Sequence, residues 1–459
     1  MFAALRQRSF ALVWLAGLIS FTGDWILLIG LPLYVYTLTR STLATSFTFM
    51  VGAVPSVLFG PIAGVFVDRW NRKTLLIVAN ILLALELLPL LLVNSAVTLW
   101  IVYVVQFVAA CVSQFLTPAT DAILPSLVEE RHLLAANSLT SVGVNVTRLI
   151  GPPLGGFVAV ALGLGGVALL DASSFALAAL LVAFITLRPI AATQHTVAEQ
   201  RLVAPTVLAE SQQEPALADA LAETDANTQA TQTKPRSLGA IFSELLDGLR
   251  LIVKTPAIRI VFTALALTSI GEGIFAALLV PFVTRALHGS GQDYGWFVGL
   301  QAVGGLVGSL VIGRFGQRIA PRWLIGFGTL GLGLVDLAIF LYPLFLPGVT
   351  LALILIMMAG LPAAGSSLGT MTLLQKTVAS AYLGRIFAAV GVIFTLFSLL
   401  GEALAGLLGD PVGVIPIITI HAITLILGGL LVLAFLPSDE QKAKQVADAE
   451  TLAGEAVHA

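Results

Sequence analysis

Charged residues and cysteine are both scarce in this chain of 459 residues. Asp, Glu, Lys and Arg make up 10% of it, whereas soluble domains carry about 25% charged residues. Together with a hydrophobic content of 58%, that shortage excludes an ordinary soluble domain. The one cysteine, Cys111, excludes a framework of internal disulfides. The net charge of −2 is not the basic surplus that nucleic acids attract, so we expect no nucleic-acid partner.

The motifs of soluble enzymes and metalloproteins are also missing. The five histidines are scattered and indicate no metal site, and no phosphate-binding glycine loop is present. The segment GSSLG (365–369) fits the pattern of a serine hydrolase, but it lies in an apolar run and not at a strand-to-helix turn. We therefore expect no catalytic residue, no cofactor, no metal and no enzyme activity. Any transport must draw on a gradient.

Long apolar runs fill most of the sequence. Runs of about 18 to 25 residues are long enough for helices that cross about 30 Å of hydrocarbon. They predict an all-α integral membrane protein with twelve transmembrane helices. The expected spans are 11–36, 44–66, 74–93, 98–117, 138–161, 166–187, 257–284, 294–313, 323–346, 349–372, 384–408 and 415–436.

Basic residues are distributed unequally between the two sides of these spans. The opposite side holds only Arg40 and Arg285. Because cytoplasmic loops carry the excess of Lys and Arg, we expect a multi-pass protein of the plasma or inner membrane with both termini in the cytoplasm. The residues on the expected cytoplasmic side are Arg6, Arg8, Arg69, Arg72, Lys73, Arg131, Arg188, Arg314, Arg318, Arg322, Lys376 and Arg385.

One polar segment divides the spans into six and six. Residues 190–236 are polar, acidic and poor in aromatic residues, which predicts a disordered cytoplasmic linker. Residues 237–256 follow with apolar residues at helical spacing, which predicts an amphipathic helix at the membrane interface. The expected organisation is a bundle of six helices (1–189), the linker, the interfacial helix, a second bundle of six (257–437) and a cytoplasmic tail (438–459).

The two halves match at offsets of 248 to 250 residues. Asp24 corresponds to Glu272, and Glu86 corresponds to Asp336. GPPLGG at 151–156 corresponds to GEALAG at 401–406. A repeated unit of six helices is typical of carriers that bind substrate between the repeats, near the middle of the bilayer.

Two motifs in this repeat resemble the major facilitator superfamily. The stretch GVFVDRWNRK is similar to its signature between spans two and three, through Gly64, Asp68, Arg69, Arg72 and Lys73. The GPPLGG segment resembles the motif of its antiporter branch, through Gly151, Pro152, Gly155 and Gly156. Further segments, including LLDASSF (169–175), resemble the drug-exporter branch that contains macrolide-efflux and siderophore-exporter proteins. The resemblance implies two pseudo-symmetric bundles of six helices.

The resemblance also suggests roles for both motifs. It implies that the acid at Asp68 ties the two halves together when the cytoplasmic side is closed, with Arg69, Arg72 and Lys73 beside it. Anchoring by the positive-inside rule explains the bases as well, but it does not explain the acid. The small residues of GPPLGG predict a close approach of helices. That approach is either a seal between the halves or ordinary tight packing.

Ionisable residues inside the spans are the candidate coupling groups, because a lipid-facing charge costs at least a few kcal/mol. Asp24 and Glu272 fall near the middle of spans one and seven, which line the central cavity in the resembled fold. Each is expected to exchange a proton or to bind a cationic substrate, unless it is a protonated acid that only bonds a neighbouring helix. Trp25 is a candidate for stacking a flat ligand. Glu402 and Arg148 are secondary candidates, either as a buried pair or as a coupling site.

These observations predict a secondary active transporter that works by alternating access. We expect export of small amphipathic compounds, resembling drugs, macrolides or siderophores, by proton antiport. The partners are a small-molecule substrate, protons and the lipid bilayer, and the protein is expected to be a monomer. An importer or lysolipid flippase of the same fold remains open as an alternative. A membrane receptor or scaffold that transports nothing is the alternative from another class.

Overall fold

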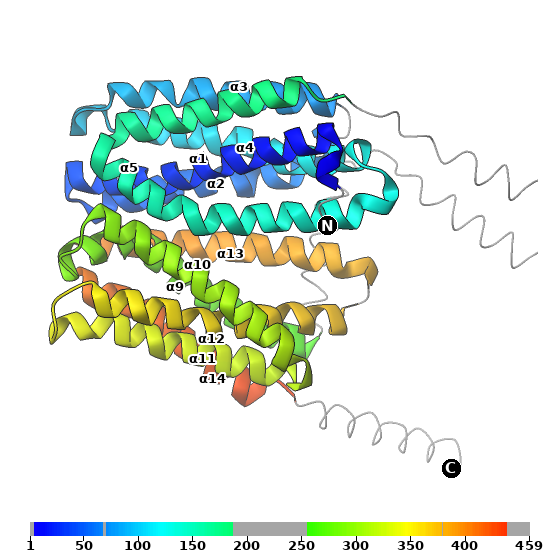
Figure 1. Cartoon of the computed structure of the whole chain (residues 1–459). Coiled ribbons are helices and arrows are strands. Elements are labelled where there is room, and N and C mark those ends of the chain that lie inside the picture. Colours follow the sequence, from blue (N-terminus) through cyan, green and yellow to red (C-terminus); the bar gives the residue numbers. More distant parts are fainter. Residues whose placement is uncertain (1–3, 68–69, 187–254, 379, 438–459) are drawn as a thin grey trace, which may run out of the picture.

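The computed structural model describes residues 4–67, 70–186, 255–378 and 380–437, and every regular element within these ranges is helical (Figure 1). The first group of helices is α1 (Arg8–Thr39), α2 (Thr42–Val67), α3 (Arg72–Glu86), α4 (Trp100–Leu127) and α5 (Leu133–Ala183). The second group is α9 (Pro256–Pro281), α10 (Gly291–Phe315), α11 (Pro321–Leu341), α12 (Thr350–Thr377), α13 (Ser380–Leu408) and α14 (Val414–Phe435). A π-helical turn, η5 (Phe282–Ala286), extends α9.

Eleven helices of the described chain are long and apolar enough to cross a membrane, where the sequence predicts twelve spans. The difference lies in α5, a stretch of 51 residues that covers the fifth and sixth predicted spans. Gly163 interrupts it with φ 63° and ψ −166°, a conformation open to glycine but strained for other residues. The chain reverses direction at Gly163, so that both arms of α5 pack along α1. Ser9 donates a hydrogen bond to the Thr186 carbonyl, and Trp14 donates one to the Leu139 carbonyl, both near the start of α1.

The other predicted spans correspond to helices whose ends differ from expectation by a few residues, with two larger differences. Helix α3 ends at Glu86, seven residues before its predicted end, and a short 3₁₀ helix, η2 (Leu88–Leu92), follows it. Helix α4 continues to Leu127, ten residues past its predicted end. The predicted linker (190–236) lies outside the described residues, and so do the tail (438–459) and nearly all of the amphipathic helix (237–256). The domain boundaries therefore remain predictions.

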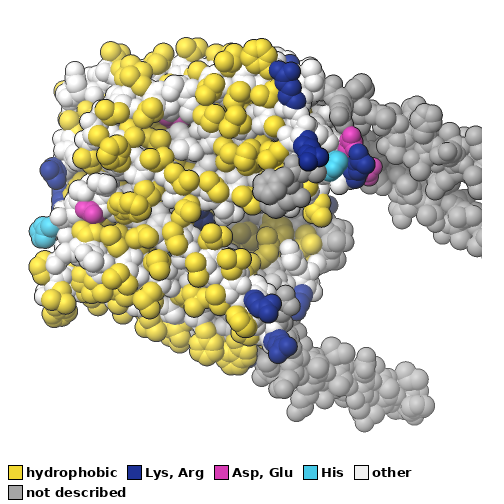
Figure 2. Space-filling view, viewed as in Figure 1, with side chains coloured by type: hydrophobic (Ala, Val, Ile, Leu, Met, Phe, Trp, Pro, Cys, Tyr) yellow, Lys and Arg dark blue, Asp and Glu magenta, His cyan; other side chains and the backbone are white. Residues whose placement is uncertain are grey.

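Apolar cores lie in both halves, and one of them joins Ile29, Leu33 and Tyr36 of α1 to the second half. Apolar side chains also cover the outside. Phe282, Phe297 and Phe340 are fully buried in the second half. Figure 2 shows hydrophobic side chains spread over the flank of the molecule, among them many large exposed ones. A soluble monomer rarely exposes so much apolar surface. The flank is therefore suited to lipid.

The two ends of the molecule are different in charge. We call the end where α1 begins and α14 finishes the inner end, and the end with Arg40 and Arg285 the outer end. Most basic side chains visible in Figure 2 gather at the inner end. Among the described residues, all hydrogen bonds between the two halves lie at the outer end. The outer end is therefore one place where the described residues join the halves in this conformation.

Candidate functional site

Three carboxyl groups lie inside the first half. Asp24 is at the centre of α1 and is exposed, and the preceding Gly23 packs on the second arm of α5. There Asp171 is fully buried; its Oδ1 accepts a 3.2 Å hydrogen bond from Ser174, while its Oδ2 has no partner in the described chain. Asp171 interacts electrostatically with Asp24 and with the half-buried Glu86 of α3. Because these interactions involve acids only, the group is suited to binding a proton or a cation.

The second half carries a base in the matching place. Glu272, at the middle of the span that α9 and η5 form, is half-buried. It interacts electrostatically with His421 of α14 and with Asp336 of α11. His421 Nε2 lies 3.2 Å from Asp336 Oδ2, and both side chains are buried. The preceding Gly271 lets α9 approach α14, because a β-carbon there would lie 2.9 Å from His421 Nδ1.

The two polar groups are equivalent in the internal repeat. The offset of 250 residues that separates Glu86 from Asp336 also separates Asp171 from His421. Neither Asp171 nor His421 was predicted as a site residue from the sequence. The constant offset was the signal that could have found them, because it pairs one polar residue of the sixth predicted span with one of the twelfth.

The remaining predicted cavity residues lie apart from these groups. Trp25 is half-buried and packs against Gly151 of α5, where an added β-carbon would lie 2.4 Å from the Trp25 β-carbon. Glu402 is buried in α13, where Oε1 accepts a 3.2 Å hydrogen bond from Ser398 and Oε2 has no partner in the described chain. Arg148 is exposed on α5, and no ion pair within the described ranges joins it to Glu402. The structure does not bring these two secondary candidates together.

The segment 151–156 contacts helices on two sides. On one side Gly155 faces α1, where a β-carbon would lie 3.0 Å from a backbone α-carbon. On the other side Gly156 faces α10, where a β-carbon would lie 2.6 Å from a backbone carbonyl oxygen. In the same way, a β-carbon on Gly295 of α10 would lie 2.4 Å from the carbonyl oxygen of Pro152. The segment therefore joins α1, α5 and α10 at backbone contact, across the boundary between the halves.

Polar contacts join the halves at the outer end. The Asp410 carboxylate accepts a 2.8 Å hydrogen bond from the Thr42 backbone N–H and pairs with Arg285 at 2.9 Å. Arg285 also donates to the carbonyl of Arg40, and its guanidinium lies 5.0 Å from the centre of the Tyr36 ring. Arg285 of η5 thus holds the end of α1, and its partner Asp410 holds the start of α2. These contacts can form only while the outer end is closed.

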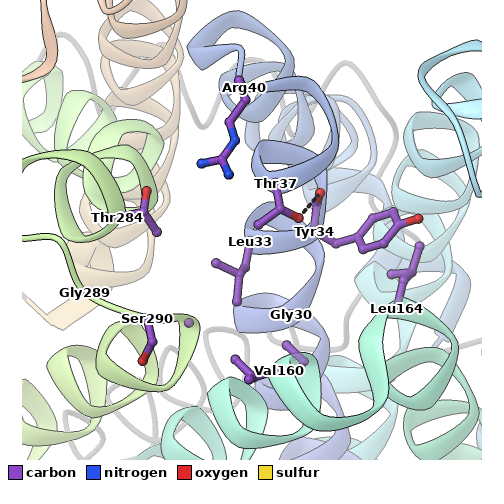
Figure 3. Close-up of a pocket in the computed structure, with 12 residues that line it drawn as sticks. Gly30, Leu33, Tyr34, Thr37, Arg40, Val160, Leu164, Thr284, Gly289 and Ser290 are labelled. Atoms are coloured by element: carbon purple, nitrogen blue, oxygen red, sulfur yellow. Dashed lines mark hydrogen bonds between the residues drawn. The ribbon is translucent and has the colours of Figure 1, made fainter.

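A cavity of about 400 Å³ lies next to this cluster, lined by both halves. Figure 3 shows Arg40 directed into the space between α1 and the chain before α10. Leu33 and Val160 line the first-half side, and Thr284 and Ser290 line the second-half side. The cavity is a crevice at the outer boundary between the halves, away from the carboxyl groups at the middle of the spans.

The predicted gate motif is only partly described. Gly64 lies in the last turns of α2, and Asp68 and Arg69 lie outside the described residues. Arg72 and Lys73, at the start of α3, each donate a 2.8 Å hydrogen bond to a backbone carbonyl of the same half, one on α4 and one just after α5. The two bases therefore bind their own half in this conformation, and the role of the acid stays a prediction.

Comparison with protein families covers most of the chain. Residues 1–210 match the model MFS_3, described as "Transmembrane secretion effector", and residues 261–456 match MFS_1, "Major Facilitator Superfamily". The chain belongs to the major facilitator superfamily. As a major facilitator protein it is a multi-pass membrane transporter and not an enzyme. The family predicted from the two motifs is confirmed, and so is its all-α membrane fold.

Several relatives extend over nearly the whole length of this major facilitator chain. It is 28% identical to "Uncharacterized MFS-type transporter YfiS" of Bacillus subtilis, over 90% of each chain. It is 23% identical to "Macrolide efflux protein A" of Streptococcus pyogenes, over 89% of this chain and 91% of the relative. It is 26% identical to "Enterobactin exporter EntS" of Citrobacter koseri, over 93% and 92%.

Solved structures show the same fold at low sequence identity. A bacterial homologue of the iron transporter ferroportin, in an inward-facing state, matches with a TM-score of 0.67 and 16% identity, over 94% of this chain and 99% of that one. The nucleoside transporter NupG matches with a TM-score of 0.69 and 13% identity, over 93% and 100%. These likenesses concern the fold alone.

Proposed function

We propose that this protein exports small amphipathic compounds by alternating access, driven by proton antiport. It works in the plasma or inner membrane with both termini in the cytoplasm, as a monomer. The observation that carries the proposal is the pair of acids Asp24 and Glu272. They occupy equivalent places at the middle of the first span of each half, and neither side chain is fully buried.

The contacts between the halves support alternating access. In the described residues the hydrogen bonds that join the halves lie at the outer end, while at the inner end Arg72 and Arg322 bind carbonyls of their own half. This is the pattern of a carrier closed on one side. Export requires the opposite arrangement to form in turn, with the outer contacts broken and the inner end closed. The Asp68 motif is suited to closing the inner end.

The positions of Asp24 and Glu272 in the middle of their spans are suited to proton coupling. A carboxyl group closed off from water favours its neutral form, and a wetted one favours its ionised form. A conformational change that alternately wets and dries Asp24 and Glu272 would therefore load and release protons. An ionised Asp24 beside Trp25 can also attract a cation and stack a flat ring, so that proton and substrate compete for one place.

The class of substrate comes from the relatives. The names of three relatives give macrolide efflux, multidrug efflux and enterobactin export. We assign to this chain the same broad class and the same direction. The exposed face of Asp24 favours compounds that carry a positive charge.

Transport into inside-out vesicles tests the proposal. A panel of cationic dyes, macrolides and siderophores would be added at an imposed pH gradient, with Asp24→Asn, Glu272→Gln and the exposed control Glu130→Gln tested against wild type. We expect wild type and the control to concentrate at least one compound, and the two site variants to lose gradient-driven accumulation. Accumulation that survives in both site variants would reject these acids as coupling groups. Net movement out of inside-out vesicles would favour the importer reading.

A further inference from the structure

A buried histidine and a buried carboxylate form a pair next to Glu272. His421 Nε2 and Asp336 Oδ2 are 3.2 Å apart, and the side chains are 3% and 4% exposed. The imidazole stacks on Phe275 with ring centroids 5.0 Å apart, and Phe340 lies 6.0 Å away. The aromatic contacts hold the pair in one arrangement that water does not reach.

Glu272 is the accessible neighbour of this pair. Its side chain is half-buried, and it interacts electrostatically with both His421 and Asp336. The second ring nitrogen of His421, Nδ1, faces the backbone of Gly271 on α9, and the two interact. Of the charged groups described, only Asp336 from α11 and Glu272 from α9 interact with His421, and α13 and η5, which also contact α14, add none.

One proton is enough to neutralise the pair. It can be held as an imidazolium beside a carboxylate, or as an imidazole beside a carboxylic acid, and the net charge is zero in both forms. A buried charge without its partner is strongly unfavourable, so the pair retains this proton while its surroundings stay dry. Glu272 is then the member of the three that can release a proton to water without leaving a buried charge uncompensated.

We propose that His421 and Asp336 are positioning residues whose paired charges set the pH at which Glu272 exchanges its proton with water. The part of this inference that concerns transport rests on the proton antiport proposed above. The electrostatic part does not, because it can be measured without substrate. The first half has no such pair, since Asp171 stands where His421 does. The two halves therefore take up protons over different pH ranges.

Removing one partner at a time gives shifts of opposite sign. In Asp336→Asn the His421 imidazolium loses its carboxylate partner, and Glu272 is the one described anion left near it. This favours the ionised form of Glu272 and moves its proton exchange to lower pH. In His421→Gln the positive charge near Glu272 is lost, which favours the neutral acid and moves exchange to higher pH. Each change is expected to move the midpoint by about one pH unit or more, a tenfold change in proton affinity.

Infrared titration of the purified protein in lipid nanodiscs measures this midpoint. The band of the protonated carboxyl that disappears in Glu272→Gln is followed against pH in wild type, Asp336→Asn and His421→Gln. Thr419→Ala, which removes only a hydroxyl that bonds within α14, is the matched control and is expected to keep the wild-type midpoint. Shifts of the same sign in the two single variants, or no shift in either, would overturn the proposal.

A double variant keeps the test decisive if one single variant does not fold. Asp336→Asn with His421→Gln removes both charges and retains two amides that can hydrogen-bond, so its midpoint is expected to return to within about half a unit of wild type. A double variant displaced as far as a single one would contradict the paired-charge account. Opposite shifts in a protein without substrate-dependent proton flux would reject proton antiport and leave this inference standing. Substrate-coupled proton flux with the same Glu272 midpoint in all variants would support proton antiport and reject this inference.

Discussion

Replacing Gly156 with alanine is expected to open the outer end of the protein. A β-carbon on Gly156 would lie 2.6 Å from the carbonyl oxygen of Gly291 and 3.1 Å from the α-carbon of Gly295. Both are backbone atoms of α10, so a side-chain rotation cannot relieve the clash. The overlap exists only while α5 and α10 are in contact. The penalty therefore falls on the conformation that is closed at the outer end.

Overpacking of this kind costs about 1–3 kcal/mol. Alanine also favours a helix over glycine by about 1 kcal/mol, but this gain stabilises α5 in both conformations and cancels in their ratio. The outer-open population should thus rise relative to the outer-closed one by a factor of about 5 to 150. The helices themselves should remain folded.

Distances between spin labels at the outer end measure that ratio. Suitable positions are Asn94, exposed in the first half, and Phe345, 81% exposed in the second, in a Cys111→Ser background. We expect the long-distance population to grow in Gly156→Ala. The matched control is Gly305→Ala on α10, where a β-carbon meets nothing within 4 Å. An unchanged distance distribution in Gly156→Ala, or an equal change in the control, would show that the contact between α5 and α10 does not hold the outer end closed.

Two smaller perturbations test other parts of the structure. Asp410→Asn should open the outer end less than the glycine variant, because it only weakens the hydrogen bond that Asp410 accepts from Thr42 across the halves. The Asp410 side chain is more than a third exposed, so this loss is worth roughly 0.2–1 kcal/mol. Its effect in the same label experiment should shrink as salt is added, and an effect that grows with salt would contradict this. Gly163→Ala should lower the unfolding temperature, because the strained turn costs a non-glycine residue about 1–3 kcal/mol. The control Gly165→Ala, with an ordinary 3.7 Å contact, should not; equal losses would show that the turn is not the cause.

Much of the fold could be predicted from the sequence because membrane spans are long and uniform. Apolar runs locate the helices to within a few residues in most cases, since a helix must satisfy its backbone hydrogen bonds inside lipid. The turn at Gly163 was harder to place. The apolar character continues through both arms of α5, so composition marks the reversal only weakly and the conformation of one glycine decides it.

The candidate site was predicted only in part. Asp24 and Glu272 stand out because a single acid in an apolar run is visible without a structure. The pairing of His421 with Asp336 is not visible in this way, because it depends on α11 and α14 lying side by side, 85 residues apart in the chain. Glu402 is the converse, because the sequence highlights it but the structure does not pair it with the other half. Its hydrogen-bond partner among the described residues, Ser398, lies on the same helix.

Proton-coupled export can be tested by the balance point of two opposing gradients. Purified protein in liposomes would face a fixed substrate gradient, with the membrane potential clamped, while the opposing pH gradient is varied until net substrate flux stops. For exchange of one proton per substrate molecule, a pH difference of one unit should offset a substrate gradient of about tenfold. In Asp24→Asn with Glu272→Gln, the account predicts that the balance point no longer moves with pH. A wild-type balance point that is independent of pH would contradict proton-coupled export.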